Sequence, residues 1–136
     1  EPPATLALQA LARAWEPRLR EASAALADDP RVLESQAVLV VKVDNRAFVN
    51  SENTRVQAAQ VTLRLMLQAN AQADDGMVLE RFENFDTHTP EQLPSQAALL
   101  ATAKRLRDEV LALRAAPLAE PYAGPAVLAG RAAGVF

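Results

Sequence analysis

Apolar residues recur at helical intervals near the start of the chain. From Thr5 to Asp29 they are three or four residues apart, which places them on one face of a helix. Thr5 is a suitable N-cap for this helix, and Pro17 predicts a kink or two consecutive helices that meet near Trp15. The predicted apolar face consists of Leu8, Leu11, Trp15, Leu19, Ala22 and Leu26.

A second helical pattern lies before the last twenty residues. Thr89 and Pro90 have the residue types of a cap and a first helical turn, and we expect Pro94-Ser95 to restart the helix. Pro117 then ends it. Its apolar stripe lies opposite a charged face and consists of Leu99, Ala103, Leu106, Val110 and Leu113.

Between the two helices the apolar period falls to two, which is the period of β-strands. Residues 33–43 carry apolar side chains on both faces, so we expect an interior position in a sheet. Asp44-Asn45 predicts a tight hairpin turn, since both residues tolerate positive φ. Residues 46–50 would then form the returning strand.

The clearest strand covers 55–71, and its alternating set runs from Gln60 to Ala71. One of its faces is therefore expected to be buried and the other solvated. Asp74-Asp75-Gly76 predicts a second hairpin turn. A further strand over 77–86 shifts its apolar register midway, as a β-bulge would cause, and a short apolar strand is predicted over 126–129.

This order of elements predicts an α+β fold, in which an antiparallel meander of about four strands packs against N-terminal and C-terminal helices. We assign residues 1–4 to a linker or a cut end and residues 5–116 to the α+β domain. Residues 117–136 would form a strand and the start of a truncated further helix.

The composition is that of an ordinary globular domain. The chain has 136 residues, half of them hydrophobic, and no cysteine, which excludes disulfides and thiolate metal sites. Its net charge of -3 and its scattered Lys and Arg residues argue against nucleic-acid binding. We expect no membrane span, since no apolar run reaches ~18 residues. The compartment stays undecided: we favour the cytoplasm and leave export open.

Candidate catalytic chemistry is sparse in this sequence. His88 is the one histidine, so we expect neither a histidine-based zinc site nor a Ser-His-Asp triad. Its polar surroundings indicate an exposed loop. The carboxylates Glu80, Glu83 and Asp86 lie on a predicted strand, and we interpret them as solvated surface.

Two further motifs carry no chemistry of their own. Asp74-Asp75-Gly76 lacks the additional oxygen ligands of a calcium loop, so we interpret it as a turn. The four glycines are not clustered into a phosphate-binding loop. We therefore predict no catalytic residue, no metal ligand and no cofactor site within these 136 residues.

Three stretches of the chain, in this order, resemble one protein family. They are FVNSENTR at 48–55, QADDGM at 72–77, and the tail PLAEPYAGP followed by VLAGRAAGVF, which ends at Phe136. They are similar to the segments that precede the active-site helix of TldD/PmbA-type zinc metallopeptidases. Relatives usually carry Gly in place of Asn53, which is a mild departure because Asn also tolerates positive φ.

The resemblance implies a zinc peptidase in which a His-Glu-x-x-x-His motif supplies two zinc ligands and a catalytic glutamate. That motif would begin just after Phe136. This chain would then be the non-catalytic portion that scaffolds the active-site helix and forms part of the wall of a peptide-binding cleft. The resemblance further implies zinc in the parent protein, a peptide or protein substrate, and a homo- or heterodimer.

Three residues are candidates to face that cleft: Asn50, Ser51 and Arg131. Asn50 and Ser51 lie in a predicted turn, and Arg131 precedes the expected active-site helix. The plainer interpretation is that all three only form the turn and the helix start. Two other functions stay open, namely an inactive partner subunit of such a protease and a stand-alone peptide- or protein-binding module.

Overall fold

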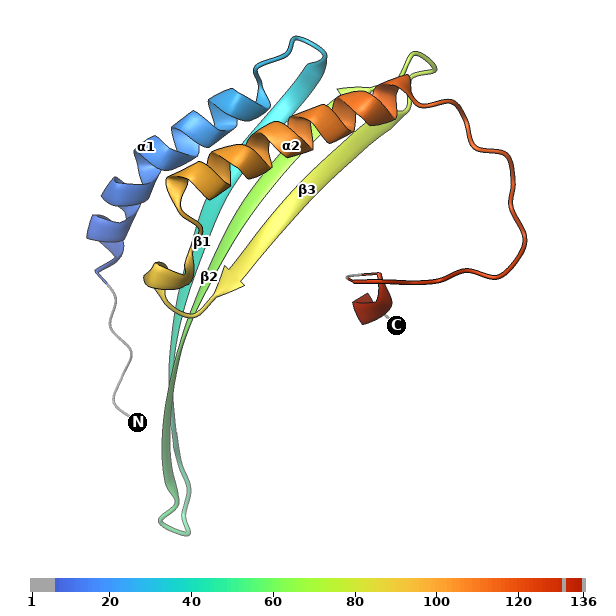
Figure 1. Ribbon diagram of the computed structural model, residues 1–136. Coiled ribbons are helices and arrows are strands. Elements are labelled where there is room, and N and C mark those ends of the chain that lie inside the picture. The colour runs from blue at the N-terminus through green and yellow to red at the C-terminus, as the bar shows by residue number, and fades with distance from the viewer. Residues whose placement is uncertain (1–6, 131, 136) are drawn as a thin grey trace.

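Both helices cover one face of a single antiparallel sheet (Figure 1). The computed structural model describes residues 7–130 and 132–135. The strand order is β1-β2-β3, so the α+β fold predicted from the sequence is confirmed. In chain order the elements are α1 (Leu8–Leu26), β1 (Val32–Val49), β2 (Arg55–Gln72), β3 (Val78–Thr87), the 3-10 helix η1 (Pro90–Gln92), α2 (Gln96–Ala115) and the 3-10 helix η2 (Ala133–Val135).

The core lies where the helices meet the central strand β2. Alternate residues of β2 are completely buried because both helices pack on the same face of the sheet. The predicted apolar faces of the two helices are confirmed, although Leu8 and Leu113 stay exposed near their ends. The buried apolar side chains are Leu63, Leu65, Leu67, Ala69 and Ala71 from β2, Trp15, Ala22 and Leu26 from α1, Leu93 between η1 and α2, and Leu99, Ala103, Leu106 and Val110 from α2.

The helix boundaries follow capping and proline chemistry. Ser95 caps α2 by accepting a hydrogen bond from the backbone N–H of Ala98 at 3.3 Å, and α2 ends shortly before Pro117. Helix α1 is continuous through Pro17, so the alternative of two consecutive helices is wrong. Pro17 lies on the exposed face, where water can solvate the carbonyl that loses its partner. The predicted cap Thr5 lies outside the described residues.

The described sheet has three strands rather than about four. The hairpin predicted at Asp44-Asn45 does not form, because β1 runs through these residues in continuous register with β2. Lys42 and Asp44 lie on the same face of β1 and form an ion pair at 2.8 Å. Both β1 and β2 are 18 residues long, so continuous pairing overrides the local turn preference. The connecting turn comes later, with Asn53 at a φ of 64°.

Two further expectations about the sheet are wrong. β1 is at the edge of the sheet and not in its interior; its second set of apolar residues, including Val40, faces the side without helices. β3 pairs with β2 without a register shift, so it has no bulge. Its apolar pattern changes phase because Phe82, which is 51% exposed, lies on the open face. A register shift occurs instead in β1, between Val32 and Glu34.

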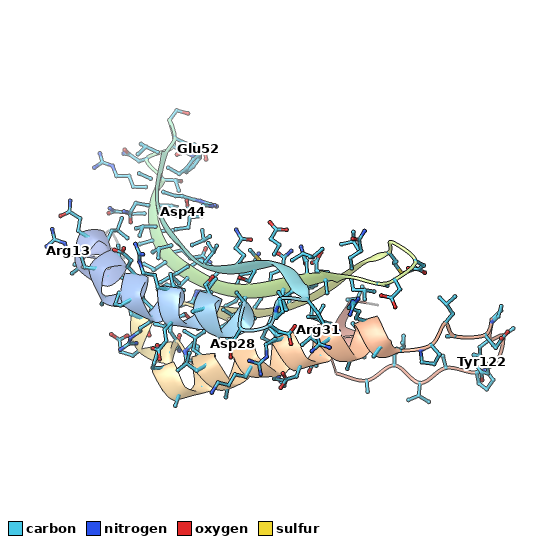
Figure 2. All side chains as sticks on the ribbon, turned by 90° about the horizontal axis from the view of Figure 1, so that it is seen from above. Arg13, Asp28, Arg31, Asp44, Glu52 and Tyr122 are labelled. Atoms are coloured by element: carbon cyan, nitrogen blue, oxygen red, sulfur yellow. The ribbon has the colours of Figure 1, made fainter. Side chains whose placement is uncertain are left out.

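The outer part of the β1–β2 hairpin and the C-terminal tail extend away from the packed layers of helices and sheet. The outer part of the β1–β2 hairpin bends away from the helix layer, with Glu52 near its tip (Figure 2). After α2 the chain continues as an extended segment (Figure 1). The strand predicted over 126–129 is not formed in the described residues, and Val127 is 95% exposed. Strand-forming residues need a paired neighbour to become a strand, and this segment has none there.

Candidate functional site at the β3 edge

The C-terminal tail returns to the edge of the sheet at β3. Ala129 and Ala132 line a hollow of about 360 Å³ together with residues 80–83 of β3 and Arg105 of α2. The hollow thus combines three segments that are far apart in the sequence. Arg131 lies between the two tail residues but outside the described residues.

A network of charged side chains ties this edge of the sheet to α2. Arg105 contacts Glu83 and Glu109, each at 2.8 Å, and Arg81 contacts Glu109 at 2.7 Å. Glu83 is buried. Hydrogen bonds donated by Arg81, and to a smaller extent by Arg105, hold the pKa of Glu109 below its usual value. The hydrogen bonds that Arg105 donates to Glu109 and Glu83 raise the pKa of Arg105. Charged partners on both elements therefore fix the position of β3 against α2.

The backbone of β3 presents hydrogen-bonding groups to the outside of the sheet. Ala73 donates its N–H to Met77 O at 2.9 Å at the start of the β2–β3 pairing, and hydrogen-bonded pairs recur at every second residue. The odd-numbered residues of β3 therefore bond to β2. The N–H and C=O groups of Glu80, Phe82 and Asn84 therefore point to the outer edge of the sheet.

Asn50 and Ser51 lie in the turn that connects β1 to β2, and the tip of this long hairpin lies far from the C-terminal tail (Figure 1). The side-chain oxygen of Asn50 accepts the backbone N–H groups of Glu52 and Thr54 at 3.1 and 2.9 Å. The Asn50 amide thus closes the turn. The structure does not bring these two residues to the tail, and their contribution to a cleft stays a prediction.

The ionic network as a whole is not apparent from the sequence pattern. Glu83 was expected on the solvated surface, whereas its side chain faces α2 and is buried. Two features of the sequence pointed to parts of this network. Arg81 and Glu83 alternate with the same period as Leu79 and Phe85, which pack on the core, so all four lie on the helix side of β3. Arg105 and Glu109 are four residues apart, the spacing of an ion pair on one helix face.

The described residues do not fit a zinc site. Within 7–130 and 132–135, no three side chains of His, Cys, Asp or Glu gather closely enough to hold a metal ion. His88 is exposed, as predicted, and its Nδ1 lies 2.9 Å from the carbonyl oxygen of Val61. A helix long and apolar enough to cross a membrane is likewise not found in this part of the chain.

Comparison with family models, curated proteins and solved structures found no match to this chain. The resemblance to the TldD/PmbA family therefore rests on the three sequence stretches at 48–55, 72–77 and 117–136 alone and stays a prediction.

Proposed function

We propose that this chain is a non-catalytic scaffold of a TldD/PmbA-like zinc metallopeptidase and forms part of its peptide cleft. The observation that carries the proposal is the position of the tail, where Ala129 and Ala132 lie beside the edge of β3. In the family that the tail resembles, this segment leads into the metal-binding helix. The β3 edge would then lie next to the catalytic centre, which this chain does not itself contain.

An extended peptide can bind here as an additional strand. The outward N–H and C=O groups of Glu80, Phe82 and Asn84 would bond to its backbone, a mode of recognition that depends little on sequence. Phe82 adds an exposed apolar surface on the open side of the strand. The ionic network holds β3 against α2, so the edge is in place before the peptide arrives.

The proposal is tested by titrating an uncharged, capped eight-residue peptide of alternating Thr and Gln into the isotope-labelled chain. We expect the amide NMR signals of Glu80, Phe82 and Asn84 to shift. The Glu80→Pro variant removes an outward N–H at a position where an edge strand tolerates proline, so it should weaken binding about three- to tenfold.

The matched control is Ala37→Pro, which alters the opposite edge of the sheet, at β1. It should leave the affinity for this peptide unchanged. Peptide binding that shifts no β3 amide signal, or that Ala37→Pro weakens as much as Glu80→Pro does, would contradict a cleft at β3.

A further inference from the structure

The opposite edge of the sheet carries an apolar groove of about 730 Å³ between α1 and β1. Trp15 on α1 is 5% exposed and lines the groove. Leu11 and Leu19, on the same face of the helix, line it as well. The groove is open along β1, the strand at this edge. Its apolar lining includes Leu11, Trp15 and Leu19 from α1 and Ala37, Leu39 and Val41 from β1.

The backbone of β1 has the hydrogen-bonding pattern of a strand acceptor. Asn50 donates its N–H to Thr54 O at 3.2 Å where the hairpin closes. By the same alternation as in β3, the even-numbered residues of β1 bond to β2. The N–H and C=O groups of Ala37, Leu39 and Val41 therefore point to the edge, and their side chains point into the groove.

The two charged side chains that line this groove are paired with each other. Both are on α1, where Arg20 contacts Glu16 at 2.9 Å. This pair adds no net charge to the groove, and apart from it and Ser23 the lining is apolar. An occupant that complements it must be uncharged and apolar on the side that faces α1. The β3 edge differs, because Arg81 and Glu83 lie on its helix side.

The devices that usually prevent strand pairing are scarce at this edge. Proteins block exposed edges with prolines, bulges and inward-pointing charges. Residues 35–43 contain no proline, and the register shift of β1 lies before them, between Val32 and Glu34. Lys42 is even-numbered, so its side chain lies on the open face and not in the groove.

We propose that β1 accepts a segment of a partner polypeptide as a fourth strand of the sheet. The segment is extended, with uncharged apolar side chains at alternate positions, and these fill the groove against Ala37, Leu39 and Val41. Its other side chains are polar and lie on the open face. This site is on the opposite edge from the β3 cleft and does not depend on the proposed role in proteolysis.

Trp15 makes the proposal measurable, since it is the only tryptophan of the chain and lines the groove. The probe is a capped eight-residue peptide of alternating Val and Thr with a Lys at each end. We expect it to change the fluorescence of Trp15 with saturation. A peptide of the same composition with its valines contiguous should bind at least tenfold more weakly, because only one or two of its valines can face the groove.

Two variants locate the binding. Ala12 is exposed on α1 and lines the groove, so Ala12→Phe fills it without changing the core and should weaken binding at least tenfold. Ala37→Pro removes an outward N–H and should weaken binding about three- to tenfold. Glu80→Pro, at the β3 edge, is the matched control and should leave binding unchanged. Circular dichroism spectra of all three variants should match that of the original chain.

Three outcomes would overturn the proposal. One is equal affinity for the two peptides, and another is a loss of binding in Glu80→Pro but not in Ala37→Pro. The third is a chain that dimerises in sedimentation experiments, ignores the peptide, and becomes monomeric in Ala37→Pro, since a second copy would then occupy β1. None of these outcomes bears on the amide shifts that test the β3 cleft.

Discussion

Arg105 of α2 contacts two carboxylates, Glu83 on β3 and Glu109 on its own helix, and the two contacts differ in their surroundings. Its partner Glu109 is partly exposed, whereas the side chain of Glu83 is only 11% exposed. Removing the guanidinium would leave the Glu83 carboxylate buried without this cation, which costs more than losing a pair in water. At the scale of single residues, the position of the β3 edge therefore depends on Arg105 more than on surface ion pairs.

We predict that Arg105→Ala lowers the free energy of unfolding by about 1–2 kcal/mol, measured by urea denaturation. The matched control is Arg20→Ala, which removes an exposed pair of the same spacing as Arg105–Glu109 on α1 and should change stability by less than about 0.5 kcal/mol. Equal losses in the two variants would show that burial of Glu83 contributes nothing.

At the scale of elements, the packing of α2 on β2 forms the larger part of the core. The stripe on α2 consists of residues at helical spacing, yet its members are not equivalent. Leu106 is completely buried, whereas Leu113 is 43% exposed where the helix leaves the sheet. The same substitution at these two positions therefore separates burial from the intrinsic helix preference of leucine.

Leu106→Ala should destabilise the chain by about 2–5 kcal/mol, because it removes buried methyl groups and leaves a cavity. Leu113→Ala changes the same residue type on the same helix and should cost less than about 1 kcal/mol. Thermal and urea unfolding of both variants measure the difference. Similar losses would contradict the orientation of α2 on the sheet.

Elements with one buried face were predictable from the sequence. The strand predicted over 55–71, in which apolar and polar residues alternate from Gln60 onward, locates β2 to within one residue, and the stripe on α2 and Pro117 locate the second helix. Local turn chemistry misled the prediction at Asp44-Asn45, because a tertiary pairing with β2 prevails there. The hollow at β3 was not predictable, since it combines residues 80–83, 105, 129 and 132, which only the folded chain brings together.

At the scale of the whole molecule, the two edges of the sheet have different chemistry. The β3 edge is held to α2 by ion pairs and lies beside the tail. The β1 edge opens onto an apolar groove under α1. This difference underlies our proposal that the sheet takes two partners, a substrate peptide at β3 and a strand of another polypeptide at β1.

The central proposal is that this chain forms the scaffold portion of a zinc metallopeptidase of the TldD/PmbA type. The most direct measurement is to read the coding sequence of the parent gene for a few dozen codons beyond Phe136. The account predicts that a His-Glu-x-x-x-His motif follows within a residue or two, on a helix that continues the tail. A stop codon or an unrelated sequence at that place would contradict it.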